Sequence, residues 1–385
     1  MRRIAAAALS MVVLCGASPS HELTPEQRAL IFGKPEAVKL AHRVARIRMA
    51  GTDRRGFYRC SYVRVTLNGH GPYTFLFDTG AAFTSLTTKV IESARLPITV
   101  ERGGFHDVIR VEHMRVGDVD IHNLVAVRDD NFGVDGVLGF HTFGDMNLTF
   151  DFQKRELLVS EEPLEMPGAF EVPYVLEKTL PTIPVKIGTQ DVAMMIDTGD
   201  DAYACEVRSS DLKGATFAHE PRTADEVRNG ANVSRTSVTT LASAIQLGPL
   251  TINDAVVGIN DALPVPDFGV EFLKAFRFSF NQKQSTVAFQ RVVSPSAVAI
   301  RGNLSPGFMP RFDESGTVSS VVPGSDASSR GMKAGDRIVS IDGRVIRNIT
   351  PRTWDHLLAT RDHLVVRWID DGKETTASFA VAELR

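Results

Sequence analysis

The triplet Asp-Thr-Gly occurs twice in this chain, each time directly after an apolar run. In FLFDTG it places Asp78 behind residues 75–77, and in MMIDTG it places Asp197 behind residues 194–196. One such turn would mean little, because aspartate is a common turn residue whose side chain bonds its own backbone. Two copies 119 positions apart suggest that the chain repeats a unit of structure, and an internal repeat constrains a fold more than composition does.

Two further pairs of segments recur in the same order as the triplets. VGDVDIHNLVAVRDD (116–130) and LGPLTINDAVVGIND (247–261) share an apolar rhythm at an offset of 131. LGFHTFGDMNLTFDFQK (138–154) aligns with FGVEFLKAFRFSFNQKQ (268–284) at an offset of 130. Because the three offsets differ only by one modest insertion, we interpret the repeat as two homologous lobes.

The lobes are predicted to span residues 52–165 and 170–292, and each has the size of a small domain. Val63 and Val65 alternate with polar residues before Asn68-Gly69, which is the pattern of a strand that ends in a tight turn. We therefore predict a mainly β protein. With 385 residues, of which 43% are hydrophobic and 23% charged, the chain is long enough for two or three cores.

The charge balance argues against two classes of partner. A net charge of −3 and a pI near 6.4 do not favour nucleic acid or an anionic membrane surface, since both attract basic proteins. The ten histidines and three cysteines form no C-x-x-C or H-E-x-x-H pattern, so we predict no metal site and no cofactor. A G-x-S-x-G elbow and a Walker loop are also absent from the sequence.

Residues 1–20 have the layout of a secretory signal peptide. Two arginines precede an apolar stretch at residues 4–14, and small residues follow it, so cleavage is predicted after Ala17. The protein is then periplasmic or extracellular, with no stable membrane span after cleavage. The alternatives are a lipoprotein attached at Cys15 and a retained anchor, although the apolar stretch is short for crossing a bilayer.

Two segments next to the leader and the lobes leave alternatives open. Residues 24–50 are predicted to be helical, with Thr24 as the cap and Gly51 as the stop, and residues 21–51 then form an arm or a propeptide. A self-processing zymogen whose arm covers the active site is a further hypothesis. Cys60 and Cys205 remain after cleavage and form either one disulfide or two separate buried thiols, because two cysteines give no spacing pattern.

The two triplets suggest a specific chemistry if the lobes face each other. Gly80 and Gly199 permit a close backbone approach that a side chain would block. Two carboxylates about 3 Å apart cannot both ionise, so they share one proton and titrate as a unit. The ionised member can take a proton from a bound water while the protonated member polarises a carbonyl oxygen. This is general acid and base catalysis on an amide.

The triplets, together with DGVLGF (135–140), resemble the signature of aspartic peptidases, specifically the retropepsin-like group in bacterial secreted proteins, with both lobes on one chain as in pepsin. The resemblance covers about residues 57–292 and implies two homologous β-barrel-like lobes with Asp78 and Asp197 as catalytic residues. No cofactor is implied. The resemblance also implies supporting positions around the carboxylates: Thr79, Gly80, Thr198, Gly199, Val137, Leu138 and Gly139.

In that family a β-hairpin flap closes over the substrate. The resemblance implies a first flap near ERGGFHD (101–107), with Gly103, Gly104 and Phe105 at its tip, because glycines suit a mobile hairpin end. The counterpart in the second lobe is predicted around residues 228–234.

The second lobe departs from the family pattern. Asp200 and Asp201 follow the second triplet, where a small or hydroxyl residue is usual, and Asp267 stands where Val137 stands in the first lobe. Carboxylates that point toward the dyad would raise its pKa, whereas carboxylates that face solvent would not. The second lobe is therefore predicted to be fully active, less active or non-catalytic, depending on where these side chains point.

The last segment resembles a bacterial PDZ domain, predicted over residues 300–385. The resemblance is carried by a Gly-Phe loop, VVPGSDAS and GMKAGDRIVSIDG, and a helix start is predicted at Thr350-Pro351. Such domains bind an extended peptide or its C-terminus at a sheet edge. The implied groove entrance consists of Leu304, Ser305, Pro306, Gly307, Phe308 and Met309. Pro306 lacks an N–H donor, and the alternative is a packing module without a ligand.

Taken together, these features predict an exported aspartic endopeptidase whose PDZ module helps to recognise peptide or protein substrates. The alternative from another class is a catalytically inactive peptide-binding or sensing protein built on the same lobes and PDZ domain.

Overall fold

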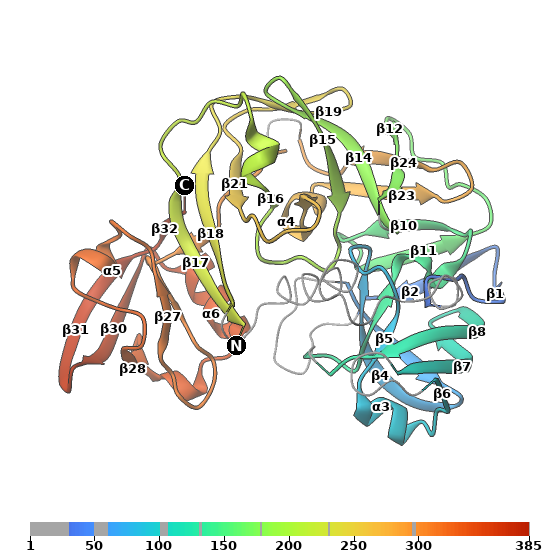
Figure 1. Cartoon of the computed structure of the whole chain (residues 1–385), viewed down its shortest axis with the longest axis horizontal. Helices are drawn as coiled ribbons and strands as arrows, with labels where there is room; N and C mark the ends of the chain where they lie inside the picture. The colour runs from blue at the N-terminus through green and yellow to red at the C-terminus, as the bar shows by residue number, and fades with distance from the viewer. Residues whose placement is uncertain are drawn as a thin grey trace.

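The computed structural model of the chain describes residues 31–49, 61–100, 107–130, 133–177, 179–229, 232–294 and 298–384. In these residues the protein is mainly β, and Figure 1 shows two lobes at the upper and right-hand side and a C-terminal domain at the left. The predicted signal peptide at 1–20, Cys60 and the first flap tip lie outside the described residues.

The first lobe is built on one eight-stranded sheet in the described residues. Its strands are, in sheet order, β1 (Ala37–Leu40), β8 (Val119–Arg128), β5 (Ser85–Leu86), β9 (Gly136–Gly139), β4 (His70–Asp78), β3 (Tyr62–Leu67), β7 (Val108–Val116) and β6 (Ile98–Val100). β3 has the predicted alternation, and it turns into β4 through Asn68 and Gly69, both at positive φ. Helix α3 (Thr88–Ser93), capped by the Thr87 side chain, follows β5.

The second lobe repeats this order. Its strands are β17 (Arg222–Asn229), β18 (Asn232–Thr240), β21 (Val256–Ile259), β16 (Cys205–Val207), β22 (Asp267–Phe268), β15 (Gln190–Ile196), β14 (Leu180–Ile187), β19 (Ile245–Leu247) and β20 (Leu250–Ile252), with β13 (Val175–Glu177) beside β14. The central strands correspond pairwise, because β4 and β9 run parallel just as β15 and β22 do. The helical turns are η3 (Phe140–Phe143) in the first lobe and η4 (Ser209–Leu212) and α4 (Val270–Leu273) in the second.

A third sheet joins the lobes. It contains β12 (Phe170–Pro173), β24 (Thr286–Arg291), β23 (Phe276–Asn281), β10 (Asn147–Asp151), β11 (Glu156–Ser160) and β2 (Val44–Arg48). At its centre Thr149 pairs with Ser279, and their hydroxyls are 2.7 Å apart. These two residues are equivalent in the sequence repeat, and equivalent residues can meet in this way only on a twofold axis. The lobes are therefore related by a pseudo-twofold axis through this sheet.

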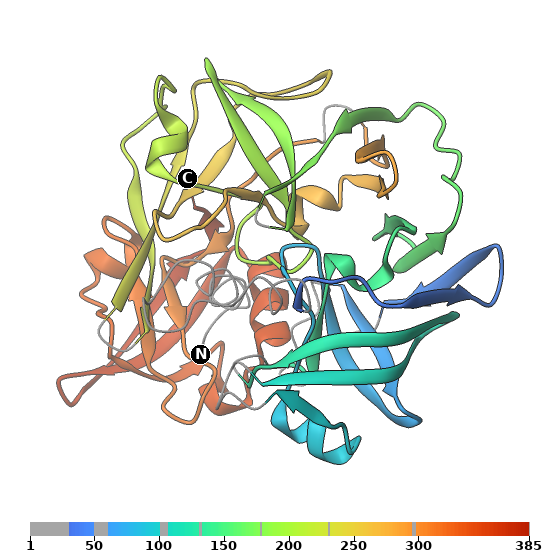
Figure 2. The same ribbon diagram turned by 45° about the vertical axis from the view of Figure 1, so that its right-hand side comes forward.

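The predicted helix over 24–50 is wrong over residues 37–48, which contain the strands β1 and β2. β1 pairs with β8 of the first lobe, and β2 pairs with β11 of the shared sheet. Ala45 and Ile47 of β2 are buried while Arg46 and Arg48 are exposed, so the segment alternates with the period of a strand. Figure 2 turns this blue segment toward the viewer, beside the long teal β7 and β8. Because β2 is a strand of the joining sheet, this segment is part of the lobes and not a separate arm.

The C-terminal domain has its own core around Trp354, Trp368 and Phe379. Its strands are β25 (Leu304–Ser305), β26 (Phe308–Pro310), β27 (Val318–Val321), β28 (Arg337–Ile341), β29 (Arg344–Val345), β30 (His363–Asp370), β31 (Lys373–Ala380) and β32 (Ala382–Glu383), and its helices are α5 (Asp326–Ser329), η6 (Ile346–Asn348) and α6 (Pro351–Thr360). The predicted helix start is confirmed, because the Thr350 side chain accepts a hydrogen bond from the Thr353 N–H, and Pro351 opens α6.

The C-terminal domain rests on the second lobe. β17 lies next to β27, as Figure 1 also shows. The linker extends this contact, because Asn303 Nδ2 donates a hydrogen bond to the Ala202 carbonyl and the Val256 N–H donates one to the Ile300 carbonyl. Among the described residues, no helix has the length and apolar character needed to cross a membrane.

Candidate active site

The two aspartates stand at equivalent points of the two lobes. Asp78 is the last residue of β4, and Asp197 directly follows β15, so both emerge from buried central strands. The apolar residues before each triplet pack in the lobe interiors, which fixes where the strands end. Each aspartate is only 1% exposed.

The threonines of the triplets cross between the lobes. The Thr79 N–H donates to Thr198 Oγ1, and the Thr198 N–H donates to Thr79 Oγ1, both at 3.1 Å. Each hydroxyl then donates onward, Thr198 Oγ1 to the Phe77 carbonyl at 2.9 Å and Thr79 Oγ1 to the Ile196 carbonyl. All four groups are buried, and every donor has a partner, so the two turns are locked together about the pseudo-twofold axis.

The glycines of the triplets allow the turns to meet. A Cβ on Gly80 would lie 2.3 Å from the Asp197 carboxyl, and a Cβ on Gly199 would lie 2.3 Å from the Asp78 carboxyl. Real Cβ atoms do not approach other atoms so closely, so any side chain here would push the opposite carboxyl away. The predicted need for glycine at both positions follows from this reciprocal contact.

The two carboxyl groups lie within hydrogen-bonding reach of each other. Asp78 Oδ1 accepts from the Gly80 N–H at 2.7 Å. Asp197 Oδ1 accepts from two donors, the Gly199 N–H at 2.7 Å and the Asp200 N–H at 3.1 Å. Two donors stabilise an anion more than one does. The geometry therefore favours Asp197 as the ionised member and Asp78 as the protonated one.

The electrostatics agree with this assignment. Burial, followed by the charge of Asp197, raises the pKa of Asp78 well above its usual range. Burial also raises the pKa of Asp197, but hydrogen bonds from Asp78, Gly199 and Asp200 oppose the rise. A carboxylic acid that donates to a carboxylate satisfies both groups, and the pair then holds one proton in common.

The strands beneath the two turns differ between the lobes. Val137, Leu138 and Gly139 lie on β9, fully buried and in register with β4, where they were predicted. The Gly139 N–H donates to Thr84 Oγ1 at 3.3 Å. In the second lobe Asp267 takes the place of Val137, and it is 3% exposed.

The extra carboxylates of the second lobe point into the protein. Asp200 is 2% exposed and Asp201 is 9% exposed, so the alternative in which they face solvent is wrong. Sequence reasoning missed a further buried acid, Glu206, which lies opposite Asp267 across β16 and β22. The only available signal was the alternation of Cys205, Glu206 and Val207, and three residues are too few to fix which face is buried.

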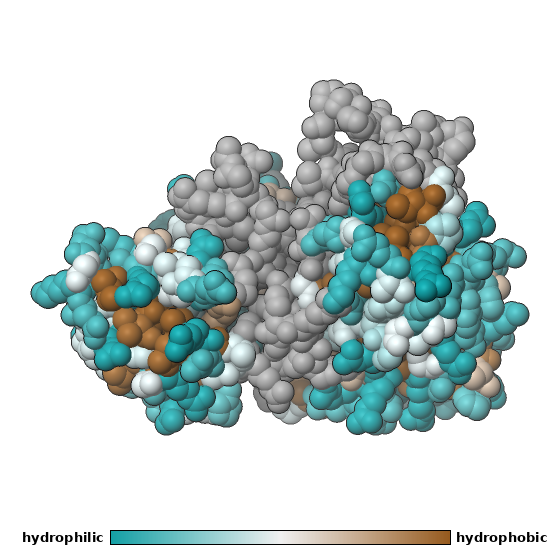
Figure 3. All heavy atoms as spheres, turned by 90° about the horizontal axis from the view of Figure 1, so that it is seen from below, coloured by the Kyte–Doolittle hydropathy of each residue, from teal (hydrophilic) through white to brown (hydrophobic). Residues whose placement is uncertain are grey.

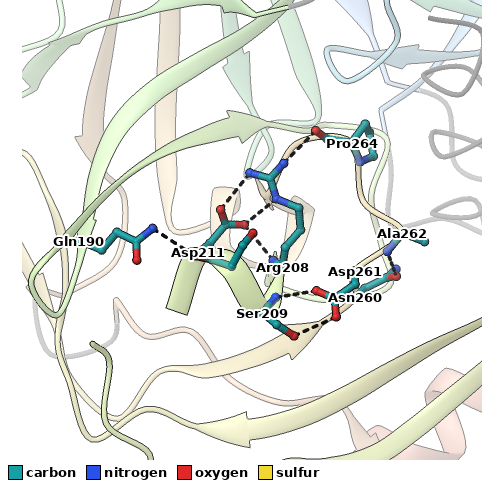
Figure 4. Close-up of polar contacts among 9 residues, drawn as sticks. Gln190, Arg208, Ser209, Asp211, Asn260, Asp261, Ala262 and Pro264 are labelled. Atoms are coloured by element: carbon teal, nitrogen blue, oxygen red, sulfur yellow. Dashed lines mark hydrogen bonds and ion pairs between the residues drawn. The ribbon is translucent and has the colours of Figure 1, made fainter. Parts of the chain in front are cut away.

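A polar network fixes the loop that leads to Asp267 (Figure 4). Arg208 forms two hydrogen bonds with the Asp211 carboxylate, at 2.8 and 2.9 Å, and a third with the Pro264 carbonyl at 3.2 Å. The Ser209 N–H and hydroxyl both donate to Asp261. Thr88 makes the same pair of bonds to Asp130 in the first lobe. The loop after β8 in the first lobe and the loop after β21 in the second are therefore held by equivalent hydrogen bonds.

The predicted groove residues of the C-terminal domain form one continuous segment. Leu304 and Ser305 pair with β32, and Gly307 has a φ of +87°, which favours glycine. The Gly307 N–H donates to Ser305 Oγ at 3.0 Å. The Phe308 side chain lies in the domain core, 5.8 Å from the Trp354 ring, while Met309 is half-buried. Phe308 therefore contributes its backbone and not its ring to any groove.

Comparison with known families matches two separate parts of the chain. Residues 63–142 match the aspartyl protease family, and residues 286–358 match the PDZ domain family. The chain contains an aspartyl protease domain and a PDZ domain. The protease match includes Asp78 but ends before Asp197, and the PDZ match begins inside β24 of the shared sheet. No curated protein matches the chain.

The flap prediction can be followed only in part. In the protease domain β6 pairs with β7, and the tip between them with Gly103, Gly104 and Phe105 lies outside the described residues. In the second lobe β17 and β18 form a hairpin that contains the predicted segment at 228–234. This hairpin lies beside the PDZ domain, because β17 is next to β27.

The remaining predictions concern cysteines and metals. Cys205 is a free, buried thiol, and burial is the main cause that raises its pKa. Its predicted partner, Cys60, lies outside the described residues. Within the part of the chain that the structure describes, no group of three or more His, Cys, Asp or Glu residues is arranged to hold a metal ion.

Proposed function

We propose that this protein is an aspartic endopeptidase in which the Asp78/Asp197 dyad activates a water molecule for attack on a peptide bond. The observation that carries the proposal is the meeting of the two turns, with reciprocal threonine bonds and two buried carboxyls in hydrogen-bond reach. The match to the aspartyl protease family supports the assignment of Asp78.

The asymmetry of the dyad gives each residue a role. Asp197 accepts two backbone hydrogen bonds and acts as the general base that takes a proton from water. Asp78 holds the shared proton and donates it toward the carbonyl oxygen of the scissile bond. Water attacks the carbonyl carbon, and the proton taken by Asp197 is later delivered to the leaving amine. The step needs no covalent bond between enzyme and substrate.

We further propose that the PDZ domain recognises an extended segment or C-terminus of a peptide or protein. Three features support this role. β26 pairs on one side with β27, Gly307 gives the preceding loop its turn, and Figure 3 shows apolar surface on this domain. Large apolar side chains exposed in this domain include Leu304, Val345 and Val365. Export to the periplasm or beyond is a further proposal, and it rests only on the sequence of residues 1–20.

The Asp78→Asn and Asp197→Asn variants test the enzymatic proposal. Asparagine keeps the shape of aspartate but cannot share or accept the catalytic proton, so peptide cleavage should fall by about a thousandfold or more. The measurement is turnover of a peptide library by the full chain, with inhibition by a pepstatin-like compound as a second readout. Circular dichroism and urea unfolding show whether each variant is folded.

Folded asparagine variants that cleave as well as the wild type would refute the dyad. A wild-type protein that cleaves nothing between acid and neutral pH, but binds peptides through the PDZ domain, would support the peptide-sensing alternative instead.

A further inference from the structure

Three buried acids of the second lobe occupy positions that are small or apolar in the first. Asp267 faces Met195 across parallel strands, as Val137 faces Leu76. Asp200 follows the second triplet as Ala81 follows the first. Glu206 lies opposite Asp267 as Ser85 lies opposite Val137. The repeat therefore aligns a carboxyl cluster of the second lobe with small or apolar residues of the first.

Two oxygens of this cluster have no ordinary donor. Asp200 Oδ2 and Asp267 Oδ1 are buried, and no donor group in the described residues bonds to either. The other oxygen of Asp200, Oδ1, accepts from the Ala202 N–H at 2.7 Å. A buried carboxylate oxygen without a donor is costly. The Asp200 and Asp267 side chains are, however, within hydrogen-bond reach of each other, so a proton held by one carboxyl can be shared with the other.

The neighbouring groups described next do not provide a positive charge that could replace the shared proton. The charges that act most strongly on it are Asp197 from the turn after β15, Glu206 from β16, and Asp201 from the same turn as Asp200. Cys205 on β16 is a buried thiol whose pKa is raised, so it carries no charge at neutral pH. Arg208 is bound to Asp211 and Pro264 instead (Figure 4). The charges of Asp197, Glu206 and Asp201 are all negative, which favours retention of a proton by the pair.

The pair is connected directly to the dyad. The Asp200 N–H donates to Asp197 Oδ1 at 3.1 Å, and the Asp200 carbonyl accepts from the Val270 N–H at 2.8 Å. In the first lobe the Ala81 N–H instead contacts the Asp78 carbonyl at 3.2 Å. The residue that carries one carboxyl of the pair thus also holds the catalytic base by its backbone.

We propose that Asp200 and Asp267 are positioning residues that share one proton and carry one negative charge beside the catalytic dyad. The pair holds the Asp200 N–H against Asp197, and its charge lets the dyad keep its own proton to a higher pH than the residues of the first lobe would. The alkaline limit of cleavage by the Asp78/Asp197 dyad then lies at a higher pH. This inference rests on the proposed peptidase function.

Two variants separate the charge of the pair from its structural role. Asp200→Ala combined with Asp267→Val installs the first-lobe residues and removes the charge. Asp267→Asn keeps one carboxylate, on Asp200, and provides an amide that can donate to it. The measurement is the pH profile of kcat/KM for a peptide substrate, because its alkaline limb reports loss of the essential proton from the free enzyme.

We expect the double variant to lose activity at lower pH than the wild type, by about one pH unit, and Asp267→Asn to keep the wild-type limb. A purely structural role would lower activity in both variants without moving the limb. The proposal is therefore overturned if the double variant is active and its alkaline limb has not moved. It is also overturned if the alkaline limb shifts equally in the double variant and in Asp267→Asn.

An infrared measurement tests the shared proton even if the protein is not a peptidase or the double variant does not fold. In the Asp78→Asn background, which removes the proton of the dyad, the infrared carbonyl band of a protonated carboxylic acid should persist at neutral pH. Adding Asp267→Asn should weaken that band, while any contribution from Glu206 stays. If the band is absent, or is unchanged by Asp267→Asn, the shared proton is refuted whatever the activity measurements show.

Discussion

The two lobes carry the same Asp-Thr-Gly turn on different supports. In the first lobe Asp78 lies above Val137 and Ala81, both fully buried and apolar. In the second lobe Asp197 lies above Asp267 and Asp200, both buried and acidic. The glycine and threonine contacts of the two turns are nevertheless reciprocal. The difference shows that symmetry of the turn does not require symmetry of its electrostatic surroundings, and that the two carboxyls can acquire different roles.

The outer contacts of the turns differ as well. Phe83, in the first lobe, contacts the ring of Phe32 from the N-terminal segment at 5.9 Å. Ala202, at the equivalent place in the second lobe, accepts the hydrogen bond from Asn303 of the linker to the PDZ domain. One turn is therefore supported by the segment before the lobes, and the other by the segment after them.

The largest expected effect comes from the feature that the lobes share. Gly80→Ala and Gly199→Ala each place a Cβ 2.3 Å from the opposite carboxyl, so each displaces the partner aspartate. Misplacing a reacting group by about 1 Å can cost about a hundredfold in rate, and we expect at least this loss in kcat for both variants. Peptide turnover measures it, with urea unfolding as the folding control. A variant with nearly wild-type kcat would show that its turn does not touch the opposite carboxyl, and would break the symmetry argued above.

An intermediate effect should come from exchanging the supports. Burial raises the pKa of Asp200 and Asp267 well above the usual value, so the folded state binds more protons than the unfolded state. Their contribution to stability is complete below the unfolded pKa and is lost as pH rises toward the folded pKa. The Asp200→Ala/Asp267→Val variant lacks this loss, and we expect it to be about 1–4 kcal/mol more stable than the wild type at neutral pH.

Urea unfolding of both proteins at acid and neutral pH measures this difference. The matched control is Val137→Asp, which buries an unpaired carboxyl in the first lobe and should destabilise the protein by about 2 kcal/mol or more at neutral pH. If Asp200→Ala/Asp267→Val is instead less stable than the wild type by the same amount at acid and neutral pH, the pair contributes packing alone. Its pKa values would then not differ between the folded and unfolded states.

The smallest expected effect concerns the outer contact of the second turn. Asn303→Ala removes the hydrogen bond to the Ala202 carbonyl, and one such bond contributes about 1 kcal/mol to the free energy of unfolding. We expect this loss in urea unfolding and little change in kcat, because the turn keeps its threonine contacts. A loss of kcat comparable to that of the glycine variants would show that the linker to the PDZ domain controls the second turn.

Local patterns predicted a large part of this structure. The repeat gave the correspondence of the lobes, and the alternation of Val63 and Val65 gave β3. The capping signal at Thr350-Pro351 gave the start of α6. These predictions held because each depends on neighbours along the chain: a turn needs its glycine, a cap needs its hydroxyl, and a repeated sequence folds the same way twice.

The failures came from contacts that are distant in sequence. Residues 37–40 and 44–48 are strands because they pair with β8 and β11. The sequence of the segment itself does not indicate these partners. The sequence could name Asp200 and Asp267 as unusual, but it could not say which way their side chains point. Strand register and the packing of the second turn decide that both are buried and adjacent.

By itself, then, the sequence predicted that two Asp-Thr-Gly turns exist, that they belong to duplicated lobes, and that a PDZ domain follows. Only the tertiary structure decided that the turns interlock through Thr79 and Thr198 and that Asp197 receives one more backbone donor than Asp78. The physical reason is that a carboxyl acquires its proton affinity from burial and from neighbouring donors and charges, and these are brought together only when distant strands pair.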